Sequence, residues 1–190
     1  MDDFITSVFT QRSYKREDML TFAIYQRQQA KSEPIRVNEE GTVAGMVSLV
    51  NVDPLNRSAE IGILQVLSSH RSREIATKTG RLLVWHALQP TEQGGLGLVR
   101  LEWRVATGNE ASERVAKNLG FNDTGLIKYE RLLKNGIARG KVGNNRVKPP
   151  GTMEGDVWRD VKIYSISWDE WPEKPEDDEY RTSDVIVDND

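Results

Sequence analysis

Apolar and polar residues alternate along much of the first half of the chain, which is the spacing of half-buried β-strands. Within residues 35–67 the turn-forming segments "NEEG" and "DPLNRS" separate apolar runs, and this pattern predicts three antiparallel strands. Residues 18–31 instead carry Met19, Phe22 and Ala30 at roughly helical spacing. That stretch predicts a helix.

Helices and strands alternate in the second half of the chain. Helices are predicted over residues 73–88 and 109–119, the second beginning at Asn109 and ending at Gly120. Strands are predicted at residues 99–105, 125–133 and 159–168. The apolar positions of the last strand change parity near residues 164–165, which predicts a bulge there.

A segment rich in Gly, Pro and Asn separates the last two strands. It spans about residues 134–159 and predicts a long, flexible hairpin loop. Six Lys or Arg and no acid occur between residues 131 and 153, whereas ten Asp or Glu occur from residue 169 onward. The sequence therefore predicts a single domain over residues 1–171 and an acidic, disordered tail over residues 172–190.

Composition removes several classes of function. The net charge of −3 favours neither nucleic acid nor a membrane surface, and the absence of Cys excludes disulfides and thiol chemistry. Two His argue against a His-based metal site. No apolar run approaches the roughly 20 residues of a membrane span, and the start lacks a secretion signal. We expect a soluble, cytoplasmic protein. The basic loop leaves a nucleic-acid or acidic partner open, although no aromatic residues accompany its charges.

Three segments together resemble one enzyme family. They are "NVDPLNRSAEIG", "RLEWRVATGNEASERVAKNLGF" and "RDVKIYSISWDEW", and they resemble the GNAT superfamily of N-acetyltransferases, within it the RimJ/RimL-like group. The long loop is similar to that of fungal members. The likeness covers about residues 43–171. It implies an α+β fold, with a mixed, mostly antiparallel sheet flanked by helices, and transfer of an acetyl group from acetyl-CoA to a primary amine without a metal.

The resemblance also implies where acetyl-CoA binds. The sheet would open between the strands at about 60–67 and 99–106, with the pantetheine arm along the earlier strand and the pyrophosphate at the start of the following helix. Backbone amides near residues 64–66 are candidate donors to the carbonyl oxygen. The expected cofactor-binding residues are Leu64, Gln65, Val66, Arg71, Ser72, Arg73, Ile75, Ala76, Asn109 and Ser112.

Each candidate catalytic residue has a structural alternative. Ser112 would donate to the leaving thiolate, or it only caps its own helix. Asn109 would bond to the pantetheine or the acceptor, or it is a plain N-cap. Glu60 would take a proton from the incoming ammonium, or it is a solvated or ion-paired carboxylate at a strand end.

Two departures from the family pattern motivate a rival interpretation. Glu74 stands where the family's phosphate loop usually has its first glycine, and the strand and helix that normally precede this fold are expected to be missing. The rival is a degenerate GNAT fold that binds a partner without catalysis. The acceptor, a protein N-terminus or a small molecule, stays open, as does an oligomeric state.

Overall fold

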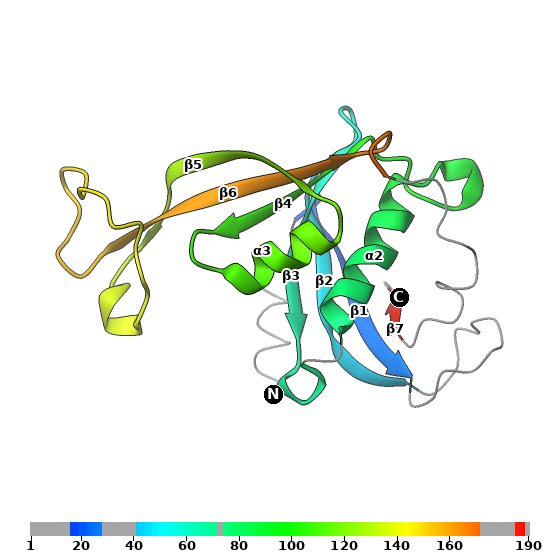
Figure 1. Ribbon diagram of the computed structural model, residues 1–190, viewed down its shortest axis with the longest axis horizontal. Helices are drawn as coiled ribbons and strands as arrows, with labels where there is room; N and C mark the ends of the chain where they lie inside the picture. Colours follow the sequence, from blue (N-terminus) through cyan, green and yellow to red (C-terminus); the bar gives the residue numbers. More distant parts are fainter. Residues whose placement is uncertain (1–15, 28–40, 72–73, 172–184, 189–190) are drawn as a thin grey trace. The chain divides into compact units, whose positions relative to one another are not determined.

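The computed structural model describes residues 16–27, 41–71, 74–171 and 185–188. The described residues cluster into two compact units, the first within residues 1–102 and 166–190 and the second within residues 103–165. The strands are β1 (Leu20–Arg27), β2 (Gly41–Asp53), β3 (Ser58–Val66), β4 (Arg100–Ala106), β5 (Asn122–Leu133), β6 (Val157–Ser167) and β7 (Val185–Asp188). The helices are α2 (Ile75–Leu88) and α3 (Glu110–Asn118), with short 3-10 turns η2 (Ser68–His70), η3 (Thr91–Gln93) and η4 (Ile137–Arg139) (Figure 1).

The first unit is built on antiparallel strands in the order β7-β1-β2-β3, with the beginning of β4 parallel to β3. The parallel ladder runs from the pair Ser58–Arg100 to the pair Glu60–Glu102. Helix α2 contacts β3 and β7. Apolar side chains from the strands and from α2 are buried together, among them Phe22, Ile24, Val47, Leu49, Ile61, Ile75, Leu83 and Val84. The predicted strands over residues 42–67 are confirmed as β2 and β3, and the predicted helix is confirmed over residues 75–88. Residue 73 and the earlier strand predicted near residue 35 lie outside the described residues.

The helix predicted over residues 18–31 is wrong for the part that the structure describes. Residues 20–27 form β1, which pairs with both β2 and β7. Phe22 and Ile24 are buried while Ala23 and Tyr25 are half-buried, so the spacing that determines the structure is that of a strand. Its helical appearance came from a short apolar run, for which pairing with neighbouring strands outweighs local propensity.

The second unit contains the end of β4, α3, β5 and most of β6. Trp103 and Val105, at alternate positions of β4, are buried with Leu119 and Phe121. The strand predicted at residues 99–105 is confirmed as β4. Gly120 ends α3 with a φ of 85° and donates its amide to the Lys117 carbonyl at 3.0 Å, which confirms the predicted helix stop.

Strands β5 and β6 pair antiparallel on either side of the long loop (Figure 1). The bulge predicted within β6 at residues 164–165 is instead on β5, where Thr124 has no ladder partner between the pairs of Asp123 and Gly125. The β6 strand also begins at Val157, two residues before the predicted start.

The acidic C-terminal segment was predicted to be disordered. Four of its residues, Val185–Asp188, form β7 and pair with β1, so the prediction fails there. Together the described strands form a mixed, mostly antiparallel sheet accompanied by helices, which confirms the predicted α+β fold class. Within the described ranges, no helix is long and apolar enough to cross a membrane.

Candidate functional site

A β-bulge interrupts β3 within the segment predicted to bind the pantetheine arm. Met46 pairs with Gln65 and Ser48 with Gly62, so two residues of β3, Ile63 and Leu64, stand opposite one residue of β2. Ile63 adopts a φ of 52°, which is rare for a β-branched side chain. Because a bulge removes its extra residue from the ladder and changes the direction of neighbouring groups, it turns backbone amides away from β2.

The bulge is accompanied by a close approach of β2 to β3. A Cβ added to Gly45 would lie 2.0 Å from the carbonyl oxygen of Gln65, so only glycine fits at this position. Just beyond, the Leu67 amide donates to the Ala44 carbonyl at 2.8 Å. The end of β3 is therefore fixed by backbone contacts rather than by side-chain packing.

The residue before α2, Glu74, adopts the left-handed conformation, with φ 57° and ψ 7°. This is the position at which the family pattern has glycine, and the backbone keeps the glycine-like geometry although the side chain is exposed. No side chain caps α2, and its first turn carries no acid. The first amides of a helix have no intrahelical partner, so this helix start favours an anion.

The residues between β3 and α2 are described in part. Arg71 is exposed directly after η2. His70 lies 3.3 Å from Thr42 Oγ1 through Nε2 and 2.8 Å from Ser69 Oγ through Nδ1, so the ring has polar partners on both sides. The predicted cofactor residues Ser72 and Arg73 lie outside the described residues.

Glu60 is held by a neighbouring side chain. Asn51 Nδ2 donates to its carboxylate at 2.7 Å, and Arg16 in turn donates to Asn51 Oδ1 at 3.1 Å. On the adjacent strand, Glu60 pairs with Glu102, whose carboxylate forms an ion pair with Arg100 at 3.2 Å. Directly paired residues face the same side of a sheet, so Glu60 and Glu102 present two carboxylates on one face.

In the second unit, the start of α3 is organised around Ser112. Asn109 Oδ1 accepts from the Ser112 amide at 3.3 Å, so Asn109 is the N-cap of α3. The indole Nε1 of Trp103 donates to Ser112 Oγ at 2.9 Å. Because the hydroxyl oxygen accepts this bond, the Ser112 hydrogen can be donated to a further acceptor. The sequence analysis predicted a strand at Trp103 but gave no sign of this contact.

A second polar cluster involves Glu113, which also lies in the first turn of α3. Lys162 Nζ and Tyr164 Oη both donate to Glu113 Oε2, at 2.8 and 3.1 Å. The Lys162 bond lowers the pKa of the Glu113 carboxyl, and Glu113 in turn raises the pKa of Lys162. Burial, followed by the bond to Glu113, raises the pKa of the Tyr164 hydroxyl. The cluster ties α3 to β6, and the sequence analysis did not predict it.

The candidate residues thus fall into two sets. One set, on β3 and at the start of α2, comprises Glu60, Leu64, Gln65, Val66, Arg71, Ile75 and Ala76 in the first unit. The other set comprises Asn109 and Ser112 in the second unit. The opening that the resemblance implies, between the strands at about 60–67 and 99–106, stays a prediction. In the first set, the bulged end of β3 and the uncapped start of α2 suit the binding of acetyl-CoA. In the second set, the bonds with Asn109 and Trp103 hold Ser112 in one position.

A family model for the acetyltransferase (GNAT) domain matches residues 2–122 of the 190. The chain belongs to this GNAT acetyltransferase family. The putative ribosomal N-acetyltransferase YdaF from Bacillus subtilis (strain 168) is 34% identical over 98 residues, which are 52% of this chain and 50% of that protein. The chain thus spans about half the length of this curated relative.

Solved structures share the fold. A spermidine N-acetyltransferase from Vibrio cholerae in complex with CoA and spermine superposes with a TM-score of 0.56 at 16% identity, covering 90% of this chain and 77% of that one. A GCN5-related N-acetyltransferase from Brucella melitensis gives a TM-score of 0.58 at 23% identity, covering 88% and 59%. At these identities the likeness shows the fold alone.

Proposed function

We propose that this chain transfers an acetyl group from acetyl-CoA to a primary amine. Family membership supports an acetyltransferase, and the observation that carries the proposal is the bulge at Ile63–Leu64 in β3. It lies in the segment to which the family resemblance assigns the pantetheine arm. Glycine at position 45 preserves this distorted geometry at the cost of packing, which is expected where backbone amides serve a ligand.

The residues present fit acetyl-CoA. Backbone groups of Leu64, Gln65 and Val66 would hold the pantetheine arm, and the start of α2 at Ile75 and Ala76 would hold the pyrophosphate. An uncapped helix start without acid in its first turn suits that anion. Arg71 is exposed there to add a charge-assisted bond, and Ser72 and Arg73 belong to the same proposed set.

When bound, acetyl-CoA supplies an activated thioester carbonyl for direct attack by the amine. Glu60, held by Asn51, would accept the proton of the incoming ammonium directly or through water. Amides at residues 64–66 would stabilise charge on the carbonyl oxygen. Ser112, oriented by Trp103, would donate to the leaving thiolate, and Asn109 would support it as the N-cap beside it.

The acceptor is proposed as a class. The printed names of the relatives include a ribosomal N-acetyltransferase and a spermidine N-acetyltransferase, whose acceptors share a primary amine. Residues 100–121 resemble the RimJ/RimL-like subgroup. Membership of that subgroup would make this chain more similar to the ribosomal N-acetyltransferase than to the spermidine enzyme. We expect a cytoplasmic setting.

The test measures free thiol released from acetyl-CoA in the presence of a panel of primary amines, including peptides with free N-termini and polyamines. Release that depends on one amine, and that falls at least tenfold in Glu60→Gln, supports the proposal. Binding of acetyl-CoA without release against any amine would favour the rival, a degenerate fold that only binds. No binding at all would refute both the cofactor and the activity.

A further inference from the structure

Three of the chain's five tryptophans line one cavity of the first unit. Trp85 belongs to the last turn of α2, and Trp168 and Trp171 follow β6. The cavity has a volume of about 740 Å³. This size suits a small molecule, since ligand sites generally measure about 300–1,000 Å³. The other lining residues are Leu88, Gln89, Pro90, Gln93 and Asp169.

A short turn holds the two later tryptophans. Trp168 donates its backbone amide to the Val99 carbonyl at 3.1 Å. Glu170 accepts from the Ser167 amide and hydroxyl, both at 2.9 Å, and the Trp171 amide donates to the Ser167 carbonyl at 3.2 Å. Trp168 is nevertheless 63% exposed. An ordered turn that presents a large aromatic side chain to solvent indicates a binding surface.

The cavity is distinct from the proposed acetyl-CoA residues. It lies at the C-terminal end of α2, whereas the phosphate-binding residues lie at the N-terminal end. A helix of 14 residues is about 20 Å long at 1.5 Å per residue. A ligand in this cavity therefore does not compete with the pyrophosphate for the same groups.

The electrostatics of the cavity favour a cation. Indole rings attract cations over their faces, the C-terminal end of α2 carries the negative end of the helix dipole, and Asp169 adds a carboxylate. No Lys or Arg is among the described residues that line it. The basic side chain in the last turn of α2 is His86, and burial lowers its pKa, which favours the neutral imidazole.

Two polar atoms of the lining residues need partners. Gln89 Oε1, an acceptor, and Trp171 Nε1, a donor, are buried without a hydrogen-bond partner within the described part of the chain. Gln89 Nε2 is already used, because it donates to Gln93 Oε1 at 2.9 Å. Leaving such groups unpaired is unfavourable, and a hydroxyl group can both donate and accept. Each atom is buried, so a side-chain rotation would have to bring it to the ligand.

We propose that this cavity binds a small organic ammonium ion that also carries a hydroxyl group. The alkylammonium group packs against the indole rings near Asp169, and the hydroxyl bridges Gln89 and Trp171. An ammonium ion would bind in this cavity whether or not the chain transfers acetyl groups.

The test compares two probes of the same shape by titration calorimetry on the full chain. Choline carries the positive charge, and 3,3-dimethylbutan-1-ol has carbon in place of the nitrogen. We expect choline to bind roughly three- to thirtyfold more tightly, which is the ratio that cation–π attraction gives. Equal affinities, or no detectable choline binding, would overturn the proposal.

Variants locate the binding. Trp168→Leu removes the ring from an exposed position and should weaken choline binding by a similar factor, whereas Trp168→Phe should retain part of the affinity for choline. Asp169→Asn should weaken the binding of choline and leave the binding of the neutral alcohol unchanged. Leu55→Ala, at a 91% exposed position on the β2–β3 turn, is the control. If Trp168→Leu melts like the parent and binds choline equally well, the cation lies elsewhere and the assignment is wrong.

Discussion

Ser112 forms one hydrogen bond through its backbone amide and another through its hydroxyl, and a substitution can remove the second without the first. Its amide completes the cap of α3 through Asn109, and its hydroxyl accepts from Trp103. The Ser112→Ala variant keeps the first bond and removes the second. A donor to a thiolate acts mainly in the transition state, so we expect kcat to fall roughly tenfold or more while acetyl-CoA affinity is unchanged.

The control for this variant is Ser165→Ala, on β6 of the same unit. It should leave kcat unaltered. If Ser112→Ala lowers the melting temperature but not kcat, the serine has a structural role only, and the proposed contact with the thiolate is wrong.

Glu74 is strained by its own backbone conformation. A left-handed φ costs an L-residue about 1–2 kcal/mol, and glycine avoids that cost but loses roughly 0.5–1 kcal/mol through unfolded-state entropy. Glu74→Gly should therefore raise the free energy of unfolding by about 0.5–1 kcal/mol, measured by urea denaturation. It should bind acetyl-CoA equally or more tightly, because a carboxylate near the pyrophosphate is removed. Glu74→Ala, which keeps the strain, is the matched comparison; equal stability of the two variants would show that the conformation is not costly.

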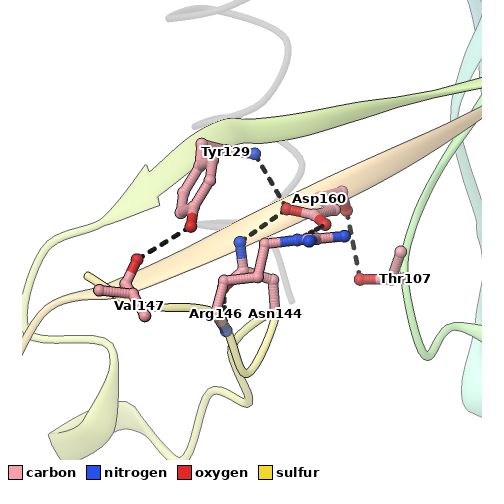
Figure 2. Close-up of polar contacts among 6 residues, drawn as sticks. All are labelled: Thr107, Tyr129, Asn144, Arg146, Val147 and Asp160. Atoms are coloured by element: carbon pink, nitrogen blue, oxygen red, sulfur yellow. Dashed lines mark hydrogen bonds and ion pairs between the residues drawn. The ribbon is translucent and has the colours of Figure 1, made fainter. Parts of the chain in front are cut away.

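At the scale of elements, the long loop is attached to the hairpin through Asp160 (Figure 2). This buried carboxylate accepts from the Tyr129 amide at 2.9 Å, Asn144 Nδ2 at 2.6 Å and Arg146 Nε at 2.6 Å. The Tyr129 hydroxyl also donates to the Val147 carbonyl at 2.9 Å. The loop that composition predicted to be flexible is thus bound at three of its residues. A second irregularity of β5, between Ile127 and Arg131, leaves Tyr129 out of the ladder, and Asp160 accepts its amide.

These bonds give the hairpin an acid-sensitive stability. Burial alone would raise the pKa of Asp160, but the bonds from Asn144, the Tyr129 amide and Arg146 outweigh burial and lower the pKa to about 2. A depressed folded-state pKa means that the unfolded chain binds the proton more readily. The contribution of Asp160 is therefore complete above about pH 4, its ordinary pKa, and is lost as the pH falls toward 2.

We predict that Asp160→Asn lowers the melting temperature at pH 7 and flattens the stability profile between about pH 4 and 2. The amide keeps one acceptor oxygen but places a donor against Arg146 or Asn144. Asp123→Asn, at an exposed position on β5, serves as the control for charge. An unchanged acid profile in Asp160→Asn would mean that other carboxylates determine the acid transition.

At the scale of the whole molecule, acetyl-CoA should act as a stabilising ligand. At a free concentration 100 times its Kd, a ligand that binds the folded state adds about 2.7 kcal/mol. For a chain of 190 residues this corresponds to a rise of roughly 5–11 °C in Tm. The rise should be smaller when Arg71→Ala is used and unchanged for Lys128→Ala, an exposed cation on β5. A flat response of the parent protein would favour the non-catalytic rival.

Most elements of this fold could be predicted because their apolar periods are long and their ends carry turn or cap residues, as at Gly120 and Asn109. Helix α2, helix α3 and strand β4 are of this kind. Strand β1 was not predicted, because its eight residues satisfy a helical and an alternating pattern almost equally, and pairing with β2 and β7 decides the outcome.

The local chemistry was less accessible to sequence analysis. Nothing in the residues "GILQ" marks a bulge, since Ile63 adopts glycine-like torsions without being glycine. The contacts of the Asp160 carboxylate join residues 14 to 31 positions apart along the chain, and the periodicity of a helix or strand gives no sign of contacts at such separations. Sequence could nominate Ser112 through a family resemblance, but not the indole that orients it.

The interrupted edge of β5 affects how this protein behaves at high concentration. Leu126 and Ile127 are partly exposed on a strand whose one neighbour in the described sheet is β6. The bulges divide its ladder into runs of two, three and three residues. Aggregating segments generally need about six or seven regular residues, so these runs are too short to recruit another chain. Deleting Thr124 would join the first two runs into five paired residues, close to that length, so concentrated solutions of the variant should become turbid sooner than those of the parent.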